Sequence, residues 1–587
     1  MQPSDDPNTF EVTVNLPGKP GILGYDFHFD AEGRSWCYGT QSDTLGGEGQ
    51  IYEAYPPSYQ ITLFDMPRAL PDWYTDGIMY QIFPDRFCRG SHEHYTPAYF
   101  EKSMLHGCWD DTPHYFRNAD GSIDYWDFFG GNLQGIIDKL DYLQSLHVSV
   151  LYLNPIFESR SNHKYDTGDY MKISPEFGDE ALFKKLCVEA KKRGIHIILD
   201  GVFSHTGDDS RYFNKYGHYD TLGAAHSPDS PWYEWYRFTN WPEVYESWWG
   251  VRSMPNVEEM TPSYQDFIYR DKDSVVRHWL KAGASGFRLD VADELPDAFI
   301  EGLKSALTDT KEDAVLIGEV WEDASRKVAY GKLRRYFWGH ELDAVMNYPF
   351  RDAMTRFMTG GASSREISRL MMSLYENYPR FAFKGNMNLI GSHDRTRILT
   401  LLGDAPTLSK ESEKENYHLS ASQYDLAIKR LKVLSLIQMT FPGVPCIYYG
   451  DEAGCQGYED PFNRGTYPWG HEDKTLLDWY KQITQLRAEN LVFAKGSWYP
   501  LPSEDDLFVY VRVFRDETVL CLFNRSPEKG YAYRNALLAD RTGTDLLTGK
   551  KCFLINIELA PLSGKIIRLN GHAFSLHDII DAHRKKQ

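Results

Sequence analysis

The sequence of 587 residues lacks any apolar run close to the roughly 20 residues that a membrane-spanning helix needs. Its opening residues, from Met1 to Asp6, carry neither the basic stretch nor the apolar stretch of a signal peptide. The eight cysteines include no Cys-x-x-Cys pair, which argues against a zinc site or a disulfide framework. From these absences we expect no membrane partner, no metal bound through cysteine, and a location in the cytoplasm, where thiols stay reduced.

An excess of basic residues is also missing. The chain has 63 Lys and Arg against 83 Asp and Glu, so its net charge is -20. A charge of this sign repels phosphate backbones, and we therefore expect no nucleic acid partner. Aromatic residues, by contrast, make up 15% of the chain. Their rings offer flat amphipathic surfaces on which sugars can stack, although large cores also use many such residues.

Short apolar runs alternate with segments of helical periodicity from about residue 71 onward. The eight runs that we predict to be strands are Ile78–Phe83, Val148–Asn154, His196–Val202, Gly286–Asp290, Val315–Val320, Leu342–Asn347, Met387–Gly391 and Val444–Tyr449. The amphipathic segments between and after them include 133–146, 180–193, 274–282, 297–307, 351–376, 423–439 and 474–487. Eight strands, each followed by a helix, predict an α/β fold of the (β/α)8 TIM-barrel type.

Three segments depart from this alternation. Residues 1–70 contain short alternating runs broken by Gly and Pro, which predict a small N-terminal β module. Residues 203–271 hold five tryptophans without a periodic pattern, and because a structureless loop of that length is unusual we expect an inserted subdomain after the third strand. The barrel then covers 71–202 and 272–495, and period-two alternation in 496–587 predicts a C-terminal antiparallel β domain.

Polar residues at the C-terminal ends of barrel strands are candidates for a site, because barrel enzymes work there. At the third, fourth, fifth and seventh strands they are Asp200 and His205, Arg288 and Asp290, Glu319 and Trp321, and His393 and Asp394. One such acid alone is usually a helix cap or an ion-pair partner. Several acids with two histidines and an arginine on one rim suit glycoside hydrolysis, in which one carboxylate attacks the sugar and another protonates the leaving oxygen.

Four segments resemble, in order and spacing, the four sequence regions of the α-amylase superfamily, glycoside hydrolase family 13. They are Asp200–His205, Gly286–Glu294, Gly318–Trp321 and Gly391–Asp394. Tyr80–Phe87, Ser161–Thr167 and Met254–Val257 are similar to segments of its cyclomaltodextrinase, neopullulanase and maltogenic amylase group. The resemblance implies a retaining hydrolase of α-1,4 bonds in maltooligosaccharides, cyclodextrins, pullulan or starch fragments, with transglycosylation as a further activity.

Carried onto matching positions, the resemblance implies Asp290 as nucleophile, Glu319 as general acid/base and Asp394 as a third carboxylate that binds sugar hydroxyls. The substrate-binding residues that it implies are Tyr165 as a stacking platform, His205 and His393 as hydroxyl donors, Asp200, Arg288, and Asp460 with Arg464 at the next sugar subsite. Arg288 lies two residues before Asp290 on one strand, so its side chain points to the same side and its charge should keep Asp290 ionised.

Three of these residues keep an alternative. For Trp321 a sugar-facing ring and a core position are equally open, and Asp460 with Arg464 could be an ordinary surface ion pair. For the function, the alternatives are an α-1,6-acting or mainly transferring enzyme of the same family and a catalytically silent glucan-binding scaffold. The intact acids Asp290, Glu319 and Asp394 argue against the scaffold.

The sequence departs from the family pattern in three places. Ser204 stands where many α-amylases have an Asn that helps to bind a structural calcium ion, and a hydroxyl is a shorter and weaker ligand than an amide carbonyl. We therefore expect no calcium at this position and no required cofactor. Met254–Glu258 also differs from the group's usual segment, which leaves the exact substrate open. The N-terminal module is shorter than usual, which leaves open whether the chain forms a homo-oligomer.

Overall fold

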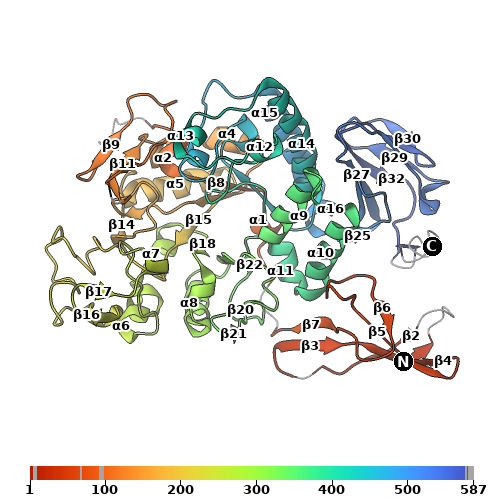
Figure 1. The fold of residues 1–587 in the computed structure, drawn as a ribbon, viewed down its shortest axis with the longest axis horizontal. Coiled ribbons are helices and arrows are strands. Elements are labelled where there is room, and N and C mark those ends of the chain that lie inside the picture. Colours follow the sequence, from red (N-terminus) through yellow and green to blue (C-terminus); the bar gives the residue numbers. More distant parts are fainter. Residues whose placement is uncertain are drawn as a thin grey trace.

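The computed structural model describes residues 1–3, 10–16, 18–65, 69–90, 98–119, 121–575 and 578–579. Its central sheet consists of eight parallel strands: β8 (Met79–Ile82), β12 (Val150–Leu153), β15 (His196–Gly201), β18 (Gly286–Leu289), β19 (Val315–Gly318), β22 (Ala344–Val345), β23 (Met387–Leu389) and β24 (Val444–Tyr448). They lie in the order β22-β19-β18-β15-β12-β8-β24-β23, and a parallel bridge between Met346 and Met387 joins the two edges. The predicted TIM barrel is confirmed (Figure 1).

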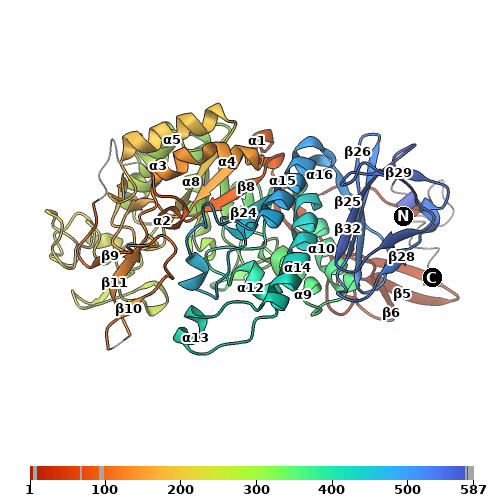
Figure 2. The ribbon, with the colours of Figure 1, turned by 90° about the horizontal axis from the view of Figure 1, so that it is seen from above.

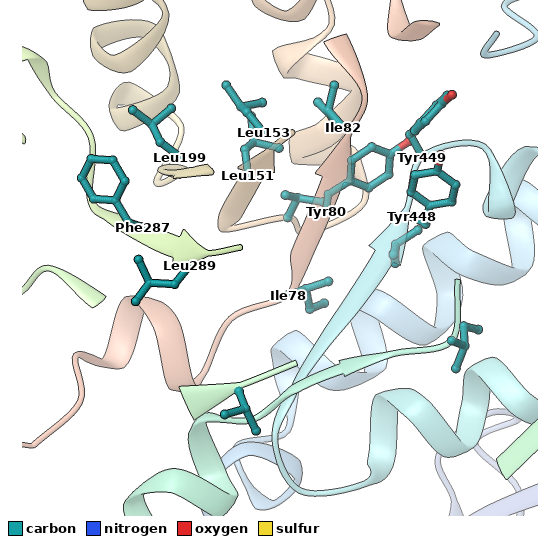
Figure 3. Close-up of a cluster of buried hydrophobic side chains, with 14 of the residues drawn as sticks. Ile78, Tyr80, Ile82, Leu151, Leu153, Leu199, Phe287, Leu289, Tyr448 and Tyr449 are labelled. Carbon is teal, nitrogen blue, oxygen red and sulfur yellow. The ribbon is translucent and has the colours of Figure 1, made fainter. Parts of the chain in front are cut away.

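Alternate residues of these strands face the barrel interior and the surrounding helices, as the period of a strand requires. Apolar residues of the inner cluster include Met79, Val150, Ile198, Val315, Ile317, Val444 and Cys446. Residues of the outer cluster include Tyr80, Ile82, Leu151, Leu153, Leu199, Phe287 and Leu289 (Figure 3). Asp200 lies two residues after the inward-facing Ile198 and pairs in register with Arg288, so this alternation also turns both charged side chains inward.

The longer helices are α3 (Leu133–Asp138), α4 (Leu140–Ser145), α5 (Glu180–Lys192), α7 (Val275–Ala282), α8 (Asp297–Thr310), α9 (Tyr348–Met358), α10 (Ser364–Asn377), α14 (Ala421–Thr440) and α15 (Lys474–Glu489). The predicted helix over 351–376 is wrong in one respect, because it is two helices. Gly360 between them has a φ of 86°, which a glycine adopts without strain. Ser363 then caps α10 in a capping box with Glu366. The predicted helix over 133–146 is likewise divided at Lys139.

Three excursions follow barrel strands. A small sheet of β9 (Ser103–Leu105), β10 (Phe116–Arg117) and β11 (Ile123–Phe128), which was not predicted, lies between β8 and β12. The hairpin of β13 (Phe157–Glu158) and β14 (Asp169–Ile173) precedes α5. The predicted insertion after β15 contains β16 (Phe238–Asn240) and β17 (Val244–Tyr245), with Trp235 buried. Figures 1 and 2 place all three at the end of the molecule opposite the C-terminal domain.

Antiparallel strands precede and follow the barrel. The N-terminal strands include β3 (Gly21–Tyr25), β4 (Phe27–Ala31), β5 (Arg34–Gly39), β6 (Gln50–Tyr52) and β7 (Tyr59–Leu63), and the Thr62 hydroxyl donates to the carbonyl of Asn377 in α10. The C-terminal sheet contains β25 (Ser497–Pro500), β26 (Leu507–Phe514), β27 (Glu517–Asn524), β29 (Thr542–Asp545), β30 (Lys551–Phe553) and β32 (Ser563–Leu569). Among the described residues, no helix has the length and apolar character needed to cross a bilayer.

Candidate active site

Arg288 is the centre of a cluster of buried charges at the C-terminal ends of the barrel strands. Its guanidinium donates to Asp200 Oδ1 and to Asp290 Oδ1, at 2.8 Å each. It also pairs with Glu319 Oε2 at 2.8 Å. All four side chains are at least nine-tenths buried. One arginine therefore joins the predicted nucleophile to the predicted general acid.

The turn after Asp290 orients Glu319. Val291 has a φ of 36°, in the left-handed region that a β-branched residue rarely adopts. Its N–H donates to Glu319 Oε2 at 2.8 Å, and Trp321 Nε1 donates to Oε1 at 3.0 Å. Backbone strain of this kind is common at functional sites. Here the strained residue, Val291, is one of the two donors that fix the carboxyl group of Glu319, one donor to each oxygen.

Tyr165, His393 and Asp394 form the adjoining part of the cluster. Nε2 of His393 lies 2.5 Å from the Tyr165 hydroxyl and 3.2 Å from Asp394 Oδ1. The other ring nitrogen, Nδ1, lies 2.9 Å from the side-chain nitrogen of Gln81 on β8. The rings of Tyr165 and His393 are nearly parallel, with their centroids 5.4 Å apart. The fold thus brings the loop after β12 against the end of β23.

Asp200 and His205 lie beneath Tyr165. Asp200 is 2% exposed and accepts hydrogen bonds from the hydroxyls of Tyr152 (2.7 Å) and Tyr165 (2.9 Å). His205 is 1% exposed, with Nε2 3.1 Å from the backbone oxygen of Tyr165 and Nδ1 3.0 Å from the Ser204 hydroxyl. Both residues therefore support Tyr165. Their predicted contact with the sugar stays a prediction.

Trp321 stands at the edge of the cluster. Its ring stacks on that of Tyr348 at 4.3 Å, and the guanidinium carbon of Arg395 lies 4.1 Å from it. The residue is nevertheless 37% exposed. It is thus neither a core residue nor a free surface ring, and its exposed part is available to a ligand.

Asp460 and Arg464 are joined to the same site. Arg464 Nη1 pairs with Asp460 Oδ1 at 2.9 Å, and Arg464 Nε donates to the backbone oxygen of His393 at 3.1 Å. The Arg464 side chain is 9% exposed. This burial and the contact with His393 distinguish the pair from an ordinary surface ion pair.

Burial raises the pKa values of Asp200, Asp290 and Asp394. Contrary to the expectation that Arg288 keeps Asp290 ionised, the pKa of Asp290 lies well above its usual value, because burial and the charges of Glu319 and Asp200 outweigh the charge of Arg288. Burial and the charge of Glu319 raise the pKa of Asp394 to about 7. Asp290 and Asp394 therefore bind a proton at a higher pH than exposed aspartates do.

Burial has the opposite effect on the two histidines. It lowers the pKa of His205 to about 4. The pKa of His393 lies well below its usual value, because of burial and then the charges of Arg464 and Arg288. Both rings are therefore neutral at pH 7, and each offers a single N–H donor.

The absence of calcium near Ser204 stays a prediction. The Ser204 hydroxyl contacts His205 Nδ1, and within the described ranges there is no group of three His, Cys, Asp or Glu side chains that could hold a metal. Calcium prefers six to eight oxygen ligands.

The sequence analysis missed several residues that contact the predicted ones. They are Gln81, Tyr152, Asn154, Tyr348 and Tyr115, of which Asn154 donates to the Tyr165 hydroxyl at 3.0 Å. Gln81, Asn154 and Tyr348 follow the same rule as the acids, because they lie at or just beyond the ends of the first, second and sixth barrel strands. Tyr115 carries no such signal, since it lies outside the barrel strands, just before β10.

A TIM barrel with carboxyl groups, one arginine and aromatic rings at the mouth is an arrangement that suits the chemistry of the glycoside hydrolase class. Residues 81–488 match the family model described as the α-amylase catalytic domain. The chain belongs to the α-amylase family.

Known relatives of the chain carry related names. An amylopullulanase of Thermoanaerobacter thermohydrosulfuricus is 36% identical over 93% of this chain, which spans only 40% of that relative's length. A cyclomaltodextrinase of Geobacillus thermopakistaniensis is 33% identical over 90% of this chain and 82% of the relative. A solved cyclomaltodextrinase structure superposes with a TM-score of 0.70 at 26% identity, covering 95% of this chain and 88% of its own.

Proposed function

We propose that this chain is a retaining hydrolase of α-1,4-glucosidic bonds in maltooligosaccharides, cyclodextrins, pullulan or starch fragments, with transglycosylation as a side reaction. The observation that carries the proposal is that the guanidinium of Arg288 contacts both carboxyl groups, Asp290 and Glu319, at 2.8 Å each. Double displacement needs one carboxylate as nucleophile and a nearby carboxyl group as acid. Cyclomaltodextrinase among the relatives supports an α-glucan as substrate.

The hydrogen bonds assign the reacting oxygens. Asp290 Oδ1 accepts from Arg288, and no described residue donates to Oδ2, so Oδ2 is the oxygen that attacks the anomeric carbon. Glu319 Oε2 contacts Val291 and Arg288, whereas among the described residues Oε1 accepts only from Trp321. The acid proton therefore lies on Oε1 and passes to the leaving oxygen. In the second step Glu319 takes a proton from water, which attacks the glycosyl-enzyme bond at the anomeric carbon.

The other predicted site residues bind the sugar in this proposal. Asp394 accepts hydrogen bonds from sugar hydroxyls, His393 donates one, and Tyr165 stacks beneath the sugar whose glycosidic bond is cleaved. Asp460 and Arg464 contact the next sugar. Trp321 contacts the leaving group, because its indole N–H is hydrogen-bonded to Glu319, which protonates that group. The chain needs no metal for these steps, and we propose that calcium is absent at Ser204. The eight free thiols support the cytoplasm as the location.

Product analysis tests the proposal. Wild-type protein is incubated with maltotriose, β-cyclodextrin, pullulan and isomaltose, and early products are followed by NMR. We expect cleavage of the first three with the α anomer formed first. Cleavage of isomaltose alone would favour the α-1,6-acting alternative, and no cleavage would favour the silent scaffold. Asp290→Asn, checked for folding by its melting temperature, should lose several orders of magnitude in activity. More than about a tenth of wild-type activity would contradict the assignment.

A further inference from the structure

Tyr115 reaches the site from a part of the chain that the proposed mechanism does not use. It lies just before β10, in the small sheet between β8 and β12, and is only 7% exposed. Its hydroxyl donates to Asp460 Oδ1 at 2.7 Å, across 345 positions of sequence, and accepts from Arg464 Nη1 at 3.4 Å. The Tyr115 hydroxyl is therefore hydrogen-bonded to both members of the Asp460–Arg464 pair.

Both protein donors to Asp460 converge on one oxygen. Tyr115 and Arg464 contact Oδ1, at 2.7 and 2.9 Å, and no residue of the described segments donates to Oδ2. The Asp460 side chain is 41% exposed. With Oδ1 held from two directions, the carboxylate plane has little freedom to rotate, and Oδ2 keeps both acceptor positions for a ligand.

The position of Tyr115 is itself held by buried charge. The N–H of the preceding residue, His114, donates to Asp127 Oδ2 at 3.0 Å, and Asp127 Oδ1 pairs with Arg86 at 3.1 Å. Trp126 packs edge-on against the Tyr115 ring, with centroids 5.5 Å apart. Burial and the charge of Asp460 raise the pKa of the Tyr115 hydroxyl, so it stays protonated and remains a donor.

We propose that Tyr115 is a positioning residue that orients Asp460 Oδ2 toward a hydroxyl of the second sugar on the non-reducing side of the cleaved bond. The inference rests on the proposed α-glucan hydrolase function. By this inference, the segment before β10 is part of the binding site for substrates with at least two sugars on the non-reducing side. Substrates that place one sugar there do not reach Asp460 and are indifferent to Tyr115.

The test compares Tyr115→Phe with wild type on two substrates. Maltotriose can place two sugars on the non-reducing side, whereas p-nitrophenyl α-glucoside places one. Removal of one hydrogen bond to a charged group should lower kcat/KM for maltotriose by about tenfold, mostly through KM. The value for the aryl glucoside should not change. Tyr125→Phe is the matched control, since Tyr125 lies on β11 of the same sheet and is 43% exposed.

A double-mutant cycle shows whether Tyr115 acts through Asp460. In an Asp460→Ala background, Tyr115→Phe should cause no further loss on maltotriose. Equal losses on both substrates, an unchanged kcat/KM for maltotriose, or additive losses in the cycle would each overturn the inference while the proposed function stands. A wild-type protein that cleaves no α-glucan would overturn both. Equal melting temperatures of Tyr115→Phe and wild type exclude a folding defect as the cause.

Discussion

Replacement of Arg288 by Met tests the electrostatic account of the site. The side chain keeps much of its length but loses the charge that contacts Asp200, Asp290 and Glu319 at 2.8 Å. The three carboxyl groups are at least nine-tenths buried, so water does not replace the guanidinium. We expect at least one of them to take up a proton as the variant folds.

The cost of that proton follows from the pKa of an unfolded aspartate, about 3.9. At 1.36 kcal/mol per pH unit, neutralisation costs about 4 kcal/mol at pH 7 and about 1.5 kcal/mol at pH 5. The value at pH 7 agrees with the roughly 3 to 5 kcal/mol lost when one partner of a buried pair is removed. Because burial already raises the pKa of Asp290 in the wild type, this cost applies to the proton that the variant binds in addition to those of the wild type. The loss is therefore present above the unfolded pKa and fades as the pH falls toward it.

Urea unfolding at pH 5, 6 and 7, followed by tryptophan fluorescence, measures this dependence. The stability difference between wild type and Arg288→Met should grow by about 1.4 kcal/mol for each pH unit. Arg270→Met is the control, because Arg270 is an exposed partner of Asp266 and should contribute at most about 0.5 kcal/mol. A loss that does not depend on pH, or that is larger at pH 5, would refute the electrostatic reasoning.

Three further predictions concern Glu319, His106 and the expected absence of calcium. Glu319→Gln should lose much less activity on an aryl α-maltoside than on maltotriose, because a good leaving group needs little protonation, and equal losses would count against Glu319 as the acid. Although burial lowers the pKa of His106, its hydrogen bonds to Asp127 and Asp111 raise it overall, so His106→Gln should lower the melting temperature below about pH 6.5 and lose this effect as the pH rises through the folded pKa. A melting temperature of His106→Gln that differs from wild type equally at pH 5.5 and pH 9 would disprove this. Dialysis against EDTA should leave the melting temperature and the activity unchanged, and a drop in melting temperature that calcium restores would refute the expected absence of structural calcium.

The barrel and the acids at its mouth could be predicted from the sequence because both depend on local rules. Strand periodicity decides which residues face the interior, so Arg288 and Asp290 had to share a side. The C-terminal ends of parallel strands meet at one rim whatever the loops do, which brings Asp290, Glu319 and Asp394 together. The helix over 351–376 shows the limit of such rules, because the amphipathic period continues across Gly360 while the backbone does not.

Contacts between distant segments were decided by the tertiary structure alone. The 2.8 Å contacts of Arg288, the left-handed turn at Val291 and the support of Tyr165 by His205 depend on how the barrel closes. Tyr115 meets Asp460 only because the chain before β10 folds over the barrel mouth, 345 positions away. No local period encodes such a meeting, since it results from the summed packing of many elements. The sequence by itself thus determined which residues could do the chemistry, and the tertiary structure decided which atoms of those residues are held and which are left open to a substrate.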